Sequence, residues 1–315
     1  MEVYKDLKAY NSKKPTAVTL GKFDGFHQGH QRLVDKIKEH ASPEVDSLLL
    51  AFDVGGRGLL TKEEQQERMK DEVDVFILCP LSEHLKRMSP EEFVEEVLVK
   101  RLNVKVLVVG SDFRFGAQRR GNTQLLLACS RKWGFRLEVL PKKTDGGQVI
   151  SSTLIKEALE KGEIERANHL LGVNYEISGI VSDGKKLGRT IGFPTLNIHP
   201  SKRKVIPKHG VYGCKVVIES AGDHDRQTDP EAKIETVDEK DEYQGICNIG
   251  IKPTATTKGE PVAEVHVFDF HEEAYGKKAK IKLLTFVRPE KKFGSIEGLR
   301  EQIARDIHQV KKNDA

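Results

Sequence analysis

The segment from Gly21 to His30, which reads GKFDGFHQGH, constrains the fold of this chain more than any other stretch. The apolar run Ala17–Leu20 precedes it and predicts a buried strand, and an amphipathic helical pattern follows it. Glycines at such a turn let the backbone approach a ligand, and the helix N-terminus offers N–H groups to a phosphate. Because His27 and His30 are three residues apart, both can face the same side of the first helical turn. This combination suits a polyphosphate whose charge grows as a bond breaks.

Two alternatives for His27 and His30 stay open on these residues alone. A histidine pair on a surface helix often has no function, and a zinc site would need a third ligand. The cysteines are scattered singly, without the spacing of a metal site, at Cys79, Cys129, Cys214 and Cys247. The glycines, the preceding strand and Asp24 favour the phosphate-binding interpretation.

Length and charge limit the classes of function. A chain of 315 residues is long enough for two domains, and its 52 basic and 48 acidic residues give a net charge of +4. This near balance does not indicate nucleic-acid binding, although it suits anionic nucleotide substrates. The sequence contains no apolar run long enough for a membrane span and no apolar signal core at its N-terminus. Together with the unpatterned cysteines, this predicts a cytoplasmic protein. The oligomeric state is not predicted.

The first half, residues 1–172, alternates apolar runs with helical patterns. The predicted strands are Ala17–Leu20, Ser47–Phe52, Val73–Cys79, Val104–Val109 and Arg136–Leu140. Helix start signals lie between them, with a capping box at Thr61 and a second helix start at Ser89. We therefore expect a Rossmann-like parallel sheet with helices on both faces, and ligands beyond the carboxyl ends of its strands.

The pattern changes in the second half, residues 173–315. Short runs rich in β-branched and aromatic residues predict strands at Tyr175–Val181, Gly210–Ile218, Tyr243–Ile249, Ala263–Phe270 and Lys280–Val287. We expect an antiparallel barrel or sandwich, closed by a helix that begins near Ser295. The polar, acidic segment Ser220–Glu242 is predicted to be an exposed loop between two strands.

Two further segments of the first half carry candidate ligand contacts. The stretch Val108–Gly116 runs from a buried strand into a loop with Arg114, Arg119 and Arg120, which suits a phosphate or a ribose. A solvated basic loop is the alternative. The hydroxyl residues Ser151–Thr153 stand at a predicted helix start, where ordinary capping explains most such triplets.

In the second half, the glycine-rich stretch Gly188–Asn197 leads into a short strand. Thr195 and Asn197 lie two apart, so a strand would put both side-chain oxygens on one face, where they suit Mg²⁺ together with substrate phosphates. Alternation likewise puts Glu264 and His266 on one face of a valine-flanked strand, and Glu264 is a candidate general base. A plain structural turn and a solvent-facing glutamate are the alternatives.

These motifs, taken in order, resemble the bifunctional riboflavin kinase / FAD synthetase family. The first segment is similar to the family's opening G-x-F-D-G-x-H-x-G-H, and later stretches resemble V-G-x-D-F-R-F-G, S-S-T and the kinase signature G-R-x-x-G-F-P-T-x-N. The ordered set runs from Gly21 to about Asp306 and covers nearly the whole chain. The resemblance implies an FMN adenylyltransferase domain in residues 1–172 and a riboflavin kinase domain in residues 173–315.

The resemblance also implies roles for individual residues. His27 and His30 would stabilise phosphates, Thr195 and Asn197 would hold Mg²⁺, and Glu264 would deprotonate the ribityl 5′-hydroxyl of riboflavin. The implied ATP and phosphate contacts are Gly21, Phe23, Asp24, Gly29, Ser151, Ser152, Thr153, Lys156, Gly188 and Arg189. The implied flavin or nucleotide loop comprises Asp112, Phe113, Arg114, Phe115, Gly121 and Asn122.

The implied reactions use ATP, riboflavin and FMN as substrates. Two departures from the family pattern concern the first half: the glycine-rich loop Asp53–Gly58 stands where the family often has Pro-His-Pro, and Lys156 stands where it has arginine. Lysine keeps the charge but loses the bidentate fork. A riboflavin kinase with a weak or inactive adenylyltransferase half is therefore the alternative, and a flavin- or nucleotide-binding regulator without catalysis is a second one.

Overall fold

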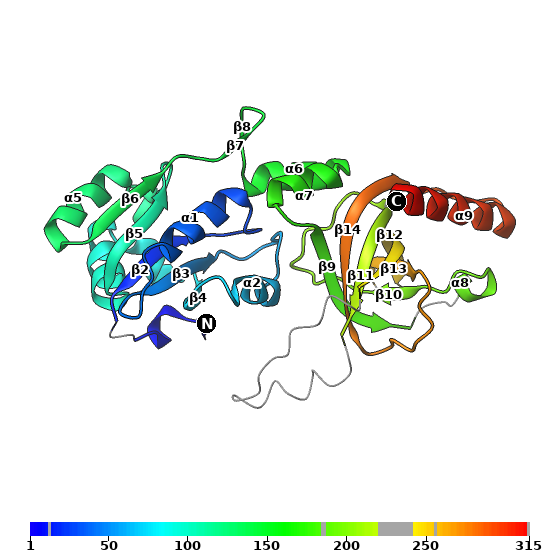
Figure 1. Cartoon of the computed structure of the whole chain (residues 1–315), viewed down its shortest axis with the longest axis horizontal. Coiled ribbons are helices and arrows are strands. Elements are labelled where there is room, and N and C mark those ends of the chain that lie inside the picture. The colour runs from blue at the N-terminus through cyan, green and yellow to red at the C-terminus, as the bar shows by residue number, and fades with distance from the viewer. Residues whose placement is uncertain (12–13, 184–186, 220–241, 255–256, 314–315) are drawn as a thin grey trace. The chain divides into compact units, whose positions relative to one another are not determined.

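The computed structural model describes residues 1–315 except 12–13, 184–186, 220–241, 255–256 and 314–315 (Figure 1). The chain divides into two compact units, Met1–Ser152 and Thr153–Ala315. The catalytic domains predicted from the sequence, residues 1–172 and 173–315, are a different division, which stays a prediction. Of the predicted loop Ser220–Glu242, all but Glu242 lies outside the described residues, and Glu242 begins a strand.

The first unit contains a parallel sheet of six strands in the order β1-β4-β3-β2-β5-β6. Its strands are β1 (Glu2–Tyr4), β2 (Thr16–Gly21), β3 (Asp46–Asp53), β4 (Val75–Pro80), β5 (Val104–Gly110) and β6 (Arg136–Leu140). The predicted strands match β2 to β6, and the Rossmann-like architecture is confirmed. Strand β1 was missed, because it is only three residues long and none of its residues is buried. The strand order reverses at β2, which lies between β3 and β5, so the loops after β2 and β5 leave the sheet at a topological switch point.

Helices cover both faces of this sheet. They are α1 (Gln28–Lys38), α2 (Lys62–Met69), α3 (Glu83–Arg87), α4 (Pro90–Glu92), the π-helix Phe93–Arg101 and α5 (Thr123–Trp133), with short 3₁₀ turns at Leu7–Ala9 and Ala117–Arg119. Alternate strand residues enter two apolar clusters: Val18 and Leu20 pack with the π-helix, whereas Ala17 packs with α1. The capping box predicted at Thr61 is present, and the helix start predicted at Ser89 also has a capping box.

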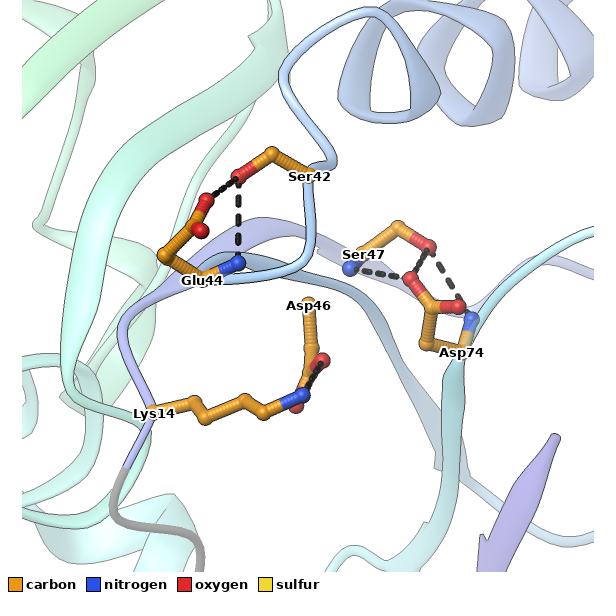
Figure 2. Close-up of polar contacts among 6 residues, drawn as sticks. All are labelled: Lys14, Ser42, Glu44, Asp46, Ser47 and Asp74. Atoms are coloured by element: carbon orange, nitrogen blue, oxygen red, sulfur yellow. Dashed lines mark hydrogen bonds and ion pairs between the residues drawn. The ribbon is translucent and has the colours of Figure 1, made fainter.

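Polar side chains fasten the amino ends of β3 and β4 (Figure 2). The Ser47 N–H and hydroxyl donate to one Asp74 carboxylate oxygen at 2.8 and 2.7 Å, and the Asp74 N–H donates to the Ser47 hydroxyl at 2.9 Å. Nearby, Lys14 pairs with Asp46 at 3.2 Å. These contacts stabilise the edge of the sheet opposite to the one from which the Gly21–His30 segment departs.

After the hairpin β7 (Thr144–Asp145) and β8 (Gln148–Val149), two helices, α6 (Ser152–Lys161) and α7 (Ile164–Leu171), open the second unit, to which all of their residues except Ser152 belong. Its strands form a closed antiparallel barrel in the order β10-β13-β12-β11-β14-β9, so the barrel alternative is confirmed and the sandwich is wrong. They are β9 (Tyr175–Ser182), β10 (Leu196–Ile198), β11 (Gly210–Ile218), β12 (Glu242–Thr254), β13 (Thr257–Val267) and β14 (Lys278–Pro289), with α8 (Leu187–Thr190) before β10.

The predicted C-terminal helix is α9 (Ile296–Asn313). It packs on the barrel through Val310, which clusters with Val211, Ile246 and Phe268. Among the described residues, no helix is long and apolar enough to cross a membrane.

Candidate active sites

The loop between β2 and α1 has an unusual backbone. Phe23 and Phe26 have φ values of 46° and 42°, in the left-handed region that side chains rarely adopt, and Gly25 has a φ of 88°. Both phenylalanines are 1% exposed, and the Phe23 ring lies 4.8 Å from the His30 ring. Strained residues of this kind persist only where their surroundings fix them, and they cluster at ligand sites.

His27 caps the N-terminus of α1. Its Nδ1 accepts hydrogen bonds from the backbone N–H groups of Gly29 and His30 at 3.2 and 3.3 Å. The expectation that the helix start offers its N–H groups to a phosphate is therefore wrong for these two residues, because an imidazole already occupies them. A Cβ on Gly29 would lie 3.1 Å from the His27 ring, so this glycine makes room for the cap. In the neutral ring, the proton sits on Nε2, which becomes the available donor.

The two histidines lie on the same side, as their spacing predicted, and their rings are stacked with centroids 3.7 Å apart and planes inclined by 15°. Burial lowers the pKa of His27 to about 4. Burial, and the neighbouring His27, hold the pKa of His30 well below its usual value. Both rings are therefore neutral at pH 7. Nδ1 of His30 is buried and has no hydrogen-bond partner among the described residues.

Asp24 connects the β2–α1 loop to two other segments. Its carboxylate accepts the Leu59 N–H at 2.6 Å, and its carbonyl accepts the Ser152 hydroxyl at 2.7 Å. Gly58 lies against the same carboxylate, since a Cβ there would be 3.2 Å from it. The other end of the Asp53–Gly58 loop is fixed by Asp53, which pairs with Lys62 of α2 at 2.8 Å. The glycine-rich loop is thus anchored at both ends.

The second predicted loop, after β5, is organised around two stacked rings. Phe113 and Phe115 lie 5.6 Å apart with planes inclined by 14°. A Cβ on Gly121 would lie 2.7 Å from the Phe115 ring, so this position needs a glycine. Asn122 caps α5 by accepting the Leu125 N–H at 2.9 Å. Phe115, Gly121 and Asn122 therefore hold the loop in shape.

The charged residues of that loop are turned to solvent. Asp112 pairs with Lys142 at 2.8 Å, and both side chains are exposed. One Arg114 guanidinium nitrogen donates to the neighbouring Phe113 carbonyl at 3.0 Å. Because β2 and β5 are neighbours, this loop and the histidine loop leave the same edge of the sheet.

The hydroxyl triplet is divided between the two compact units. Ser151 and Ser152 belong to the first, and Ser152 is placed beside Asp24 as described. Thr153 and Lys156 lie on α6 in the second unit. Within the first unit, the structure brings Ser152 to the histidine loop.

In the barrel, two of the residues predicted from alternation, Asn197 and Glu264, lie in one row across the strands. Asn197 of β10 and Asn248 of β12 are the direct cross-strand partners of Glu264 on β13, one on each side. Val265 and Val267 are buried on the other face, as the alternation predicted. Asn197 is only 5% exposed. Asn248 was not a predicted site residue, because only the strand register reveals that it adjoins Glu264.

The turn before β10 is tight. The Phe193 N–H donates to the Gly188 carbonyl at 2.8 Å, and a Cβ on Gly188 would lie 2.2 Å from the Phe193 carbonyl oxygen. Glycine is thus the residue this turn accommodates. Arg189 lies next to it, within α8. Thr195 follows the turn directly and precedes β10 by one residue, so its place on the face of Asn197 stays a prediction.

Comparison with known proteins agrees with both halves of this description. A family model described as FAD synthetase matches residues 9–154, and one described as riboflavin kinase matches residues 171–313. A relative from Haemophilus influenzae, named bifunctional riboflavin kinase/FMN adenylyltransferase, is 34% identical over 94% of this chain and 93% of its own. The chain belongs to this family.

Other relatives support the same assignment. The Bacillus subtilis protein of the same name is 32% identical over 92% of this chain and 90% of its own length. A crystal structure from Streptococcus pneumoniae, described as a macrolide-efflux protein, has a TM-score of 0.82 and 25% identity and covers 98% of both chains. The chain therefore shares the fold of that structure over nearly its whole length.

Proposed function

We propose that this chain phosphorylates riboflavin to FMN and then transfers AMP from ATP to FMN, which gives FAD and pyrophosphate. The observation that carries the proposal is that each half combines a family match with an assembled polar site: the stacked histidines in one and the Glu264 row in the other. The relatives named for both activities cover more than nine tenths of the chain.

In the kinase half, Glu264 is the proposed general base. Its carboxylate takes the proton of the ribityl 5′-hydroxyl, the hydroxyl oxygen attacks the γ-phosphorus of ATP, and ADP leaves. The cross-strand neighbours Asn197 and Asn248 are uncharged amides, so neither adds a negative charge beside the base.

The same face fits Mg²⁺. Thr195 and Asn197 supply neutral hard oxygen donors, which suit Mg²⁺ when phosphates complete its coordination. These two residues would hold the ion beside Glu264, where it would neutralise charge on the ATP phosphates.

In the adenylyltransferase half, a phosphate oxygen of FMN attacks the α-phosphorus of ATP, and the bond to the β-phosphate breaks. No covalent enzyme intermediate is needed, so the protein acts by positioning and by stabilising charge. His27 would donate from Nε2 to a phosphate oxygen as a neutral ring, because its pKa lies near 4. His30, with its unpartnered buried Nδ1, is the second proposed phosphate contact.

Each half serves as the control for the other in the test. Glu264→Gln should lower FMN formation from riboflavin by roughly 10²-fold or more, as expected for a lost general base, while FAD formation from FMN continues. His27→Asn should do the reverse. Asparagine is a favoured N-cap, so this variant keeps α1 capped and removes the phosphate donor. A Glu264→Gln protein with normal FMN formation, or a His27→Asn protein with normal FAD formation, would refute the corresponding role.

No observation favours the alternative of a kinase with a weak adenylyltransferase half. The Asp53–Gly58 loop is anchored to Asp24 rather than loose, and the relatives are named for both reactions. The proposed partners are the small-molecule substrates riboflavin, FMN and ATP. A cytoplasmic location, with no binding to nucleic acid or membranes, stays a prediction.

A further inference from the structure

His266 lies on the same face of β13 as Glu264, two residues further along, and contacts the turn before β10. Its Nδ1 is 2.8 Å from the carbonyl oxygen of Pro194. A carbonyl oxygen can only accept, so Nδ1 carries the proton and the imidazole is the donor. Pro194 is the residue immediately before Thr195. A side chain of the strand that carries the general base thus holds the backbone next to a proposed Mg²⁺ ligand.

The imidazole is kept in this orientation by aromatic rings. The Phe193 ring lies edge-on to it at 5.5 Å with an angle of 84°, and the Phe268 ring lies at 5.8 Å with an angle of 60°. Edge-to-face contacts of this kind fix the plane of a ring. Phe193 is itself bonded through its N–H to Gly188, so the contact reaches back across the whole turn.

Strand register shows what this hydrogen bond controls. Leu196 pairs with Val265 and Asn197 with Glu264. Continuing this antiparallel register by one residue places Thr195 opposite His266. The His266–Pro194 bond therefore extends the attachment of β10 to β13 just beyond the regular ladder, on the side where the turn arrives.

We infer that His266 is a positioning residue for phosphoryl transfer, a role that rests on the proposed kinase function. By holding the Pro194 carbonyl, it fixes Thr195 relative to Glu264 and so sets the position of the metal-bound phosphates relative to the base. A misplacement of about 1 Å can cost a factor of ~10² in rate, which makes a single backbone anchor at this point consequential.

Three substitutions separate the hydrogen bond from the packing. His266→Phe keeps a ring between Phe193 and Phe268 but removes the donor. His266→Asn places an amide N–H near the original Nδ1, whereas His266→Gln carries the same amide one methylene further out, away from the Pro194 carbonyl. The asparagine and glutamine variants are thus chemically matched and differ only in reach.

The test measures riboflavin phosphorylation as a function of Mg²⁺ concentration, with FAD formation from FMN as the reference for each preparation. We expect His266→Phe and His266→Gln to lower kcat about 10-fold or more and to raise the Mg²⁺ concentration needed for half-maximal rate. His266→Asn should stay within a few-fold of the unaltered protein on both measures. FAD formation from FMN should be the same in every variant.

Three results would overturn the inference. One is a His266→Phe protein with unaltered kcat and Mg²⁺ dependence. Another is equal impairment of the asparagine and glutamine variants, which would show that the donor's position is irrelevant. The third is absence of FMN formation by the unaltered protein, which would refute the proposed kinase function itself. This failure differs from the first two because it is seen without any substitution.

Discussion

Asp24 offers the sharpest quantitative test of how the histidine loop is held. Its carboxylate accepts the Leu59 N–H at 2.6 Å, and the Leu59 residue is completely buried. Replacing Asp24 by alanine leaves that N–H without this acceptor. Hydrogen bonds to charged groups contribute about 1.5–3 kcal/mol, so Asp24→Ala should lower the free energy of unfolding by about 2 kcal/mol. Asp24→Asn keeps a side-chain oxygen and should cost less than about 1 kcal/mol.

The chain provides its own probe for this measurement. Its single tryptophan, Trp133, ends α5 in the first compact unit, so tryptophan fluorescence during urea unfolding reports the unit that contains Asp24. With a denaturant slope of about 2 kcal/mol per molar urea, a loss of ~2 kcal/mol shifts the midpoint by about 1 M. Equal urea midpoints for the alanine and asparagine variants would refute the reasoning. The side-chain oxygen that asparagine keeps as an acceptor for the Leu59 N–H would then contribute nothing to stability.

Three further predictions concern other contacts. The pKa of His27 falls from 6.5 to about 4 on folding, so the unfolded chain binds more protons between these pH values; the stability this contributes is full above pH 6.5 and is lost as pH falls towards 4. The free energy of unfolding should fall by about 3 kcal/mol over this range. Measured by urea unfolding, it should depend less on pH in His27→Asn, and identical pH profiles for the variant and the unaltered protein would contradict this prediction. Gly188→Ala would push a Cβ into the Phe193 carbonyl, and we expect it to abolish FMN formation while FAD formation from FMN persists; a normal kinase rate would refute the tight turn. Asp306 of α9 is 3% exposed, and its carboxylate is bonded to the Arg288 guanidinium of β14 at 2.8 and 2.9 Å. Asp306→Ala should therefore lower the free energy of unfolding by about 3–5 kcal/mol and speed amide hydrogen exchange in α9. Unaltered exchange would argue against a role of this ion pair in holding α9 on the barrel.

Much of the fold could be predicted because apolar patterning is local. Runs such as Val104–Val109 are buried in the parallel sheet, and the capping boxes at Thr61 and Ser89 mark where helices begin. The alternation around Glu264 predicted which face it shares with His266. Each of these signals lies within a few residues of sequence, so each can be read without knowledge of tertiary contacts.

The parts that could not be predicted depend on backbone conformation or on register. Histidine is not among the residues that usually cap helices, so nothing in the sequence indicated that His27 would bond the N–H groups of α1. Phe23 has a left-handed backbone, a conformation that a bulky residue disfavours by itself. Packing imposes it. Asn248 lies 16 residues from Glu264 in sequence and becomes its neighbour only when β12 and β13 pair.

The most direct test of the two proposed activities is a time course of the products that the purified protein forms from riboflavin, ATP and Mg²⁺. The products are separated by chromatography, and a parallel reaction starts from FMN. FMN should accumulate first and FAD should follow in the first reaction, and FAD should form without delay in the second. FMN without FAD in either reaction would contradict the proposed role of His27 and His30. Absence of FMN from the riboflavin reaction would contradict the role of Glu264 and its row.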